Sequence, residues 1–228
     1  MLTGIIGAMA VETEAIKSMI EAPKKEYYSG IEFVSGKLCG KNVVVAQCGI
    51  GKVFAALCTE AMILKYAPDR IINTGVAGTL SPEVGLLDIV VSSSVVEHDM
   101  DTSPLGDPIG LISGINIVNI PASKSLAIEI LGAAERLGKK CALGVIASGD
   151  QFIAERSKKE YIHNTFSALA CEMEGAAVGH VCYVNGVDFA IIRSISDNAD
   201  DAAGTMDYPT LCQKAAEQSQ GLLLELLK

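Results

Sequence analysis

The sequence predicts an α/β fold, in which a mostly parallel or mixed sheet is covered by helices. Apolar, strand-like runs alternate with helical patterns from one end of the chain to the other, which is typical of this class. Hydrophobic residues make up 50% of the 228 positions, enough for a substantial core, and no short repeat or low-complexity stretch interrupts them. No shift in composition marks a domain boundary. We therefore expect a single domain over residues 1–228.

The individual elements follow from the spacing of the apolar residues. Short apolar runs predict strands, which in chain order are residues 3–9, 31–49 (two strands joined at 39–42), 69–75, 87–99, 141–150, 167–174 and 187–197. Helical periodicity predicts helices at residues 11–21, 52–67, 124–138 (ended by Gly138), 156–166, 175–186 and 208–228. One long irregular region, residues 98–116, is rich in proline and glycine, and a loop of that length is usually functional.

Charge and composition exclude several classes of protein. The net charge of −9 argues against a surface for nucleic acid or anionic membrane, because both select basic patches. The seven cysteines are scattered without a CxxC pair, which indicates reduced thiols in a cytosolic protein, and the three histidines form no metal-ligand pattern. The N-terminus lacks the basic region of a signal peptide, and no apolar run reaches the length of a membrane span. We expect a soluble, cytoplasmic protein without a metal.

Polar residues and glycines gather where the predicted strands end. In open α/β sheets, ligands bind beyond the carboxyl ends of the strands. Glu12 follows the first strand, and Asp197 ends the last long one. Between them, strands end in "TGVAG", "SGDQF" and "EMEG". These groups would converge at one edge of the sheet, which is therefore the candidate site.

Asp197 and Glu12 each allow a structural and a functional interpretation. Asp197 shares strand parity with Arg193, so it could form a buried ion pair or cap the next turn. Partly withdrawn from water, it could instead hold a proton near neutral pH and act as a general acid. Glu12 could simply be an acid favoured by a helix dipole, or a carboxylate that takes a proton from water. Arg193, the only cation at these strand ends, could neutralise one of the glutamates.

The stretch "CEMEGAAVG" at residues 171–179 raises the question of why two glutamates flank Met173 at the end of an apolar strand. Strand alternation would project Glu172 and Glu174 to one face, as a site needing acceptors beside an apolar surface requires. Alternatively, both are acids at the start of the next helix, favoured by its dipole.

The aromatic and glycine residues at these strand ends also allow two interpretations each. Phe152 is a packing residue or a stacking platform. The glycines of "NTGVAG" either make a turn or let a flat ring or a ribose approach the backbone. "GIIGAM" lacks the spacing of a dinucleotide-binding fingerprint, so a nicotinamide cofactor is not supported.

Several blocks, in fixed order over nearly the whole chain, resemble the motifs of the 5′-methylthioadenosine/S-adenosylhomocysteine nucleosidase family, within the nucleoside phosphorylase-like superfamily. They are "IIGAMAVETEA", "GIGKVFAA", "INTGVAG", "DIVVSSSVVEHDMD", "SGDQFI", "EMEGAAVGHVC" and "RSISDNAD". The resemblance implies a three-layer α/β/α sandwich with a mixed central sheet, a homodimer, and an adenine nucleoside as substrate. It implies no metal and no organic cofactor.

The resemblance also implies roles for individual residues. Asp197 would protonate the adenine at N7, and Glu12 would activate the attacking water, which Arg193 helps to position. Substrate contacts are implied for Glu174 (ribose hydroxyls), Met173 (ribose), Phe152 (stacking on adenine), Ile153 (backbone to the adenine edge), Gly78 (beside the nucleoside), Glu172 (supporting the site from behind), Met9, Ile50, Val76 and Ser196.

Hydrolysis is favoured over phosphorolysis by the charges around the first glycine turn. A phosphorylase must bind a dianion, which calls for arginines there. The turn instead reads "GAMAVETEA", with no Lys or Arg before Lys17. The alternatives are a purine nucleoside phosphorylase, another purine nucleosidase acting on 5′-deoxyadenosine or aminofutalosine, and a non-catalytic nucleoside-binding module. A structural α/β protein with buried ion pairs would bind no adenine at all.

The chain departs from the family pattern at two places. Val76 stands where the family commonly has a serine whose hydroxyl would bond near Asp197. We therefore expect this chain to be active but slower than Val76→Ser, and equal rates would contradict this. The loop after "HDMD" lacks the aromatic residues that many relatives donate across the dimer. Thr102 and Leu105 would be the nearest equivalents, and residues 102–113 would contribute to the partner's 5′ pocket.

Overall fold

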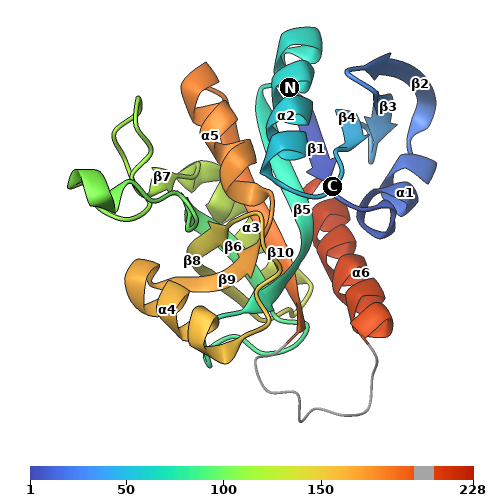
Figure 1. Cartoon of the computed structure of the whole chain (residues 1–228). Helices are drawn as coiled ribbons and strands as arrows, with labels where there is room; N and C mark the ends of the chain where they lie inside the picture. The colour runs from blue at the N-terminus through green and yellow to red at the C-terminus, as the bar shows by residue number, and fades with distance from the viewer. Residues whose placement is uncertain (198–207) are drawn as a thin grey trace.

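The computed structural model describes residues 1–197 and 208–228 (Figure 1). Within them, ten strands form one mixed sheet. The strands are β1 (Leu2–Gly7), β2 (Glu21–Tyr28), β3 (Ile31–Leu38), β4 (Lys41–Gln47), β5 (Arg70–Thr79), β6 (Ile89–Glu97), β7 (Ile120–Pro121), β8 (Cys141–Ser148), β9 (Ala168–Glu172) and β10 (Asp188–Asp197). The helices are α1 (Ala10–Ser18), α2 (Lys52–Tyr66), α3 (Lys124–Arg136), α4 (Arg156–Phe166), α5 (Gly175–Asn185) and α6 (Tyr208–Leu226), with a 3₁₀ turn η1 (Ser103–Leu105). Residues 198–200 of the motif "RSISDNAD" lie outside the described part.

The two larger apolar cores, one on each face of the sheet, confirm the three-layer α/β/α arrangement. Successive strand residues point to opposite faces, so Ile6 and Ile71 pack on one side, and Ile5 and Ile72 on the other. The first core includes residues of α2 and α5, which lie beside each other in Figure 1. The second includes residues of α1, α3 and α6. Strands buried on both faces read as continuous apolar runs, which is why the sequence shows them clearly.

The sheet topology brings the strand ends together. β1 runs parallel to β4 and β5, and β10 runs parallel to β5. β10 also pairs with β6, which leads through β8 to β9, and β9 returns to β5 where Gly78 pairs with Cys171. The curl of the sheet therefore places the ends of β5, β9 and β10 at one point.

The predicted first helix is too long, because α1 ends at Ser18 and Glu21 already belongs to β2. Strand β2 was missing from the sequence prediction. It pairs with β3 at the edge of the sheet, and most of its residues are exposed. An exposed edge strand has no apolar face to reveal it, and Pro23 further weakens the strand pattern.

The region between β6 and β7 is irregular, as expected. It contains η1 and an isolated bridge between Ile112 and Ile117. In the part of the chain that the structure describes, no helix is long and apolar enough to cross a membrane.

Candidate active site

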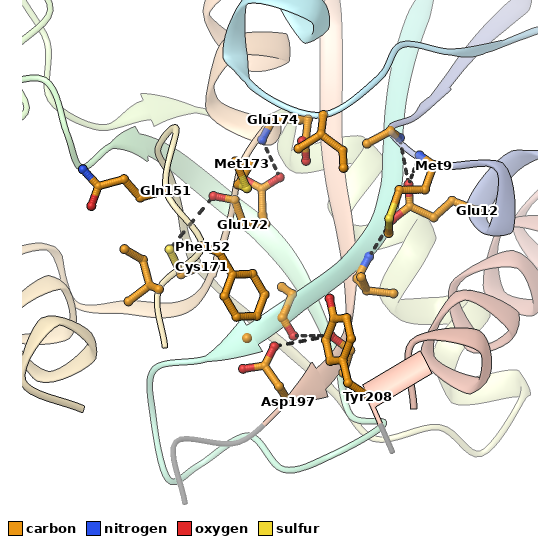
Figure 2. A pocket seen from close by; sticks show the side chains of 17 residues that line it. Met9, Glu12, Gln151, Phe152, Cys171, Glu172, Met173, Glu174, Asp197 and Tyr208 are labelled. Atoms are coloured by element: carbon orange, nitrogen blue, oxygen red, sulfur yellow. Dashed lines mark hydrogen bonds between the residues drawn. The ribbon is translucent and has the colours of Figure 1, made fainter. Parts of the chain in front are cut away.

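A cavity lies at the carboxyl ends of the strands (Figure 2) and collects all the predicted site residues except Arg193. These are Met9 and Glu12 after β1, Ile50 after β4, Val76 and Gly78 in β5, Phe152 and Ile153 after β8, Glu172, Met173 and Glu174 at the end of β9, and Ser196 and Asp197 at the end of β10. Among the described residues, five that line the cavity were not predicted: Ala8, Ala77, Gln151, Cys171 and Tyr208.

Glu12 has the position that the structural interpretation expects, and its activation of a water stays a prediction. It lies in the first turn of α1, where its Oε2 accepts hydrogen bonds from the backbone nitrogens of Ala8 at 2.7 Å and Met9 at 2.9 Å. Its Oε1 accepts a longer bond of 3.2 Å from the backbone nitrogen of Val76. Burial raises the pKa of Glu12, and the charge of Arg193 and these three bonds oppose the rise. Oε1, with a single long bond, is the oxygen with acceptor capacity left for a water.

Strand β5 continues to Thr79, so "TGVAG" is not the predicted turn. Its two glycines make room for carboxylates instead. A Cβ on Gly75 would lie 2.6 Å from Oε1 of Glu12, and a Cβ on Gly78 would lie 2.8 Å from Oδ1 of Asp197. Any side chain at either position would displace one of these acids, so each glycine is required for a close approach.

Glu172 is held from several directions at once. It forms a buried ion pair with Arg193 and accepts a hydrogen bond from the Ser148 hydroxyl. It also accepts bonds from the backbone nitrogens of Glu174 at 3.0 Å and Gly175 at 2.8 Å, at the start of α5. These contacts support a structural role for Glu172, as an acid at the start of the next helix. They also agree with the expectation that Glu172 supports the site from behind.

Arg193 lies beneath the cavity. It is buried, bonds to Asn73 and Glu172, and lies 4.0 Å from Glu174. Its observed role is to neutralise glutamates, which was one of the two roles considered from the sequence; contact with the attacking water stays a prediction.

Glu174 differs from Glu172, although only Met173 separates them. Strand β9 ends at Glu172, so the predicted strand alternation does not reach Glu174, which is the N-cap residue of α5. Its Oε1 accepts a bond from the backbone nitrogen of Gly51 at 2.8 Å. Burial, followed by the charge of Glu172, raises the pKa of Glu174 to about 7. Glu174 thus keeps acceptor capacity for a ligand and changes charge near neutral pH.

We expect Glu172→Gln and Glu174→Gln to affect stability differently. Glu172→Gln removes the partner of a buried arginine, which should lower the free energy of unfolding by about 3 kcal/mol or more. Glu174→Gln should change it by less than about 1 kcal/mol, because burial already disfavours the ionised form. Urea unfolding of both variants measures this, and equal losses would contradict the assignment.

Asp197 faces the cavity because the end of β10 is irregular. The pairing of β10 with β5 shifts by one residue between Ile195 and Asp197. The predicted shared parity with Arg193 is therefore wrong: Arg193 points into the core, and Asp197 lines the cavity. Oδ1 of Asp197 forms an ion pair with Nζ of Lys159 at 3.1 Å, and the Ser196 hydroxyl lies 3.5 Å from Oδ2. Lys159, in α4, carried no signal that would have linked it to a strand end.

Two aromatic rings form one wall of the cavity (Figure 2). Phe152 is 63% exposed, and Tyr208 meets it edge-on with ring centroids 6.0 Å apart. This exposure argues against Phe152 as a plain packing residue, and its stacking on a flat ligand stays a prediction. Tyr208 begins α6, so no strand end marked it, although an aromatic residue at a helix start close to Asp197 in sequence was a usable signal.

The whole chain is similar to known nucleosidases. Residues 3–228 match the phosphorylase superfamily. The chain is 42% identical to the 5′-methylthioadenosine/S-adenosylhomocysteine nucleosidase of Shewanella halifaxensis, over all of this chain and 99% of that protein.

Two solved structures from Helicobacter pylori are similar in fold. A variant nucleosidase with 5′-methylthioadenosine in its active site is 36% identical, with a TM-score of 0.92 over 98% of this chain and 96% of that one. Futalosine hydrolase is 35% identical, with a TM-score of 0.91 over 99% and 96%. The sequence blocks, the fold and these relatives agree: the chain belongs to the 5′-methylthioadenosine/S-adenosylhomocysteine nucleosidase family of the phosphorylase superfamily.

Proposed function

We propose that the protein hydrolyses the N-glycosidic bond of 5′-methylthioadenosine and S-adenosylhomocysteine, releasing adenine and the 5-thio-substituted ribose. The observation that carries this proposal is the convergence of Glu12, Glu174 and Asp197, from three different elements, on one cavity with an aromatic wall. An N-glycosidase needs an acid for the base, a carboxylate for water and acceptors for the ribose, and these three residues can supply them.

The reaction begins at the adenine. Adenine is a poor leaving group as an anion, so Asp197 protonates N7 while Phe152 stacks on the ring and the backbone of Ile153 bonds to its edge. As the glycosidic bond breaks, positive charge develops on the ribosyl ring. Glu174 holds the ribose hydroxyls and Met173 packs against the sugar. Glu12 then takes a proton from the water that attacks the anomeric carbon.

Water, and not phosphate, is the nucleophile that the charges favour. Among the described residues that line the cavity, four are acidic and none is Lys or Arg. Arg193 is committed to Glu172 below the cavity. A phosphate dianion would therefore meet uncompensated negative charge.

The test is adenine release from 5′-methylthioadenosine with and without added phosphate. An adenine release rate that does not depend on phosphate, with free methylthioribose as the product, supports hydrolysis. Phosphate-dependent release of a sugar phosphate would show a phosphorylase, and no release from any adenine nucleoside would favour a binding module.

Futalosine-type nucleosides are a second candidate substrate class, because a similar structure is named futalosine hydrolase. The side of the cavity near Ile50 is open, and that side chain is 56% exposed. Values of kcat/KM for methylthioadenosine, adenosylhomocysteine, 5′-deoxyadenosine and aminofutalosine, measured in parallel, rank the 5′ substituents.

A homodimer would close this open side. Ile50 continues into exposed apolar residues of α2, namely Val53, Phe54 and Leu57, and Leu105 in η1 is 83% exposed. Apolar patches of this kind mark protein interfaces. A second copy would cover the patch and place residues 102–113 beside the partner's 5′ pocket. Light scattering of the parent and Leu105→Asp, with KM measured for both, tests this: a monomeric parent contradicts it.

A cytosolic location is supported by the thiols. All seven cysteines are free, and burial raises the pKa of Cys182 and Cys171 far above the usual range. Such thiols are unreactive and fit a reducing compartment.

Ribose binding should weaken as the pH falls below about 7. The pKa of Glu174 is raised to about 7, so the carboxylate is ionised above this pH and becomes protonated below it. A protonated acid loses acceptor capacity for the ribose hydroxyls. We expect KM to rise by up to about tenfold per pH unit below 7. Glu174→Gln is the control: its KM should be higher than that of the parent but flat across the same range. A flat profile in the parent would contradict this role.

A further inference from the structure

We propose that Lys159 is the positioning residue of Asp197, and that it fixes the carboxylate from behind so that the cavity receives one defined oxygen. The inference rests on the proposed function, in which Asp197 is the general acid. Lys159 comes from α4, an element that otherwise contributes nothing to the cavity lining. Its Nζ lies 3.1 Å from Oδ1 of Asp197, within the range of an ion pair that is also a hydrogen bond.

Lys159 is more deeply buried than Asp197, and this shows from which side the ammonium reaches the carboxylate. The side chain of Lys159 is 5% exposed, whereas that of Asp197 is 21% exposed and lines the cavity. The ammonium therefore approaches the carboxylate from the protein side and leaves the cavity side to a ligand. With Oδ1 accepting a hydrogen bond from the ammonium, Oδ2 is the oxygen that would carry the proton in the acid form of Asp197 and pass it to a base in the cavity.

The remaining contacts of Asp197 are weak or only steric. The Ser196 hydroxyl lies 3.5 Å from Oδ2, longer than a normal hydrogen bond between oxygens. Gly78 leaves room for the carboxylate without holding it. Among the described residues, Lys159 thus provides the one short polar contact that orients the acid. Proton transfer requires about 2.6–3.2 Å between heavy atoms, and a misplacement of about 1 Å can reduce a rate by about 10²-fold.

Burying a lysine is unfavourable unless its ammonium group is paired with an opposite charge and hydrogen-bonded. Lys159 lies on the buried face of α4, as do Ile162 and Phe166. An apolar side chain would pack there without desolvating a charge. The competing explanation is a purely structural ion pair. Removing a structural pair would lower stability and slow every reaction alike. Removing a positioning residue would slow only the step that needs the acid.

The experiment compares two leaving groups in the parent, Lys159→Met and Lys159→Arg. One substrate is 5′-methylthioadenosine, whose adenine needs a proton. The other is the 4-nitrophenyl glycoside of 5-methylthioribose, whose phenolate leaves without one. Lys158→Met, which removes an exposed lysine from the same helix, is the matched control.

We expect Lys159→Met to lower kcat for adenine release by about 10- to 100-fold, with KM and nitrophenolate release within about threefold of the parent. Lys159→Arg should keep most of the activity, because a guanidinium can hold the carboxylate equally well. Partial unfolding would lower both reactions alike, so the ratio of the two rates remains informative even for an unstable variant.

Three results would overturn the proposal. Unchanged adenine release in Lys159→Met would show that the pair has no role in the reaction. Equal losses for both leaving groups would show a structural ion pair. Loss in Lys159→Arg as large as in Lys159→Met would point to proton donation by the lysine, since arginine does not give up its proton. A parent that releases no adenine at all would instead refute the proposed function.

Discussion

Asp197→Asn is expected to lower kcat for adenine release by about 10²- to 10⁴-fold, the usual contribution of a general acid. The amide has the shape of the carboxyl group but no acidic proton for N7. It can still accept a hydrogen bond from Lys159, so the end of β10 should keep its geometry. Initial rates of adenine formation from 5′-methylthioadenosine at saturating substrate measure the effect.

Binding provides the control for this variant. In the proposed function Asp197 acts on the leaving group, whereas Glu174 and Phe152 hold the nucleoside. The dissociation constant of 5′-methylthioadenosine for Asp197→Asn should therefore stay within about threefold of the parent's KM. Calorimetry with the slow variant gives this constant directly. A kcat within tenfold of the parent would mean that another group protonates the base.

Glu12→Ala is expected to produce a comparable loss, about 10²- to 10⁴-fold in kcat, because the variant lacks the carboxylate that would take a proton from the attacking water. Burial raises the pKa of Glu12, which favours a group that must accept a proton from water. Since the base must be ionised to act, the rate of the parent should also fall as the pH drops through this raised pKa.

Rescue by a small anion separates a missing base from a damaged site. The alanine variant leaves space beside Gly75, where Oε1 of Glu12 lies in the parent. Azide, which needs no base, should enter and restore adenine release with formation of a ribosyl azide. Glu12→Gln fills the space and should show no rescue. If azide fails with the alanine variant while 5′-methylthioadenosine still binds, the role of Glu12 as base is contradicted.

The sequence predicted the cavity well because its residues follow buried strands. Parallel strands such as β1, β5 and β10 are apolar on both faces, so the polar residues at their ends stand out. The edge strand β2 was invisible for the opposite reason, since its exposed residues carry no periodic apolar signal.

Lys159 and Tyr208 were missed because they reach the site from helices. A lysine in a polar helix such as "RSKKEYIHNTF" looks like any solvated residue, and only the packing of α4 against β9 makes it buried. The irregularity in β10 was also hidden, because the shift depends on its pairing with β5 and not on its own residues. Likewise, the residues of "CEMEG" alone do not predict that Glu172 pairs with Arg193 or that Glu174 accepts a hydrogen bond from Gly51, because both partners are distant in sequence.

The two glycines of β5 have a consequence for the stereochemistry of the product. Glu12 lies against Gly75 and Asp197 against Gly78, three residues further along the strand. Three strand residues span about 10 Å, so the two acids would act at separate points, Glu12 on the water and Asp197 on the base. A water that attacks directly, with no covalent intermediate, enters opposite the departing base and inverts the anomeric carbon. The β-nucleoside should therefore yield the α-anomer of the free sugar, with the backbone of a single strand determining the handedness of the product.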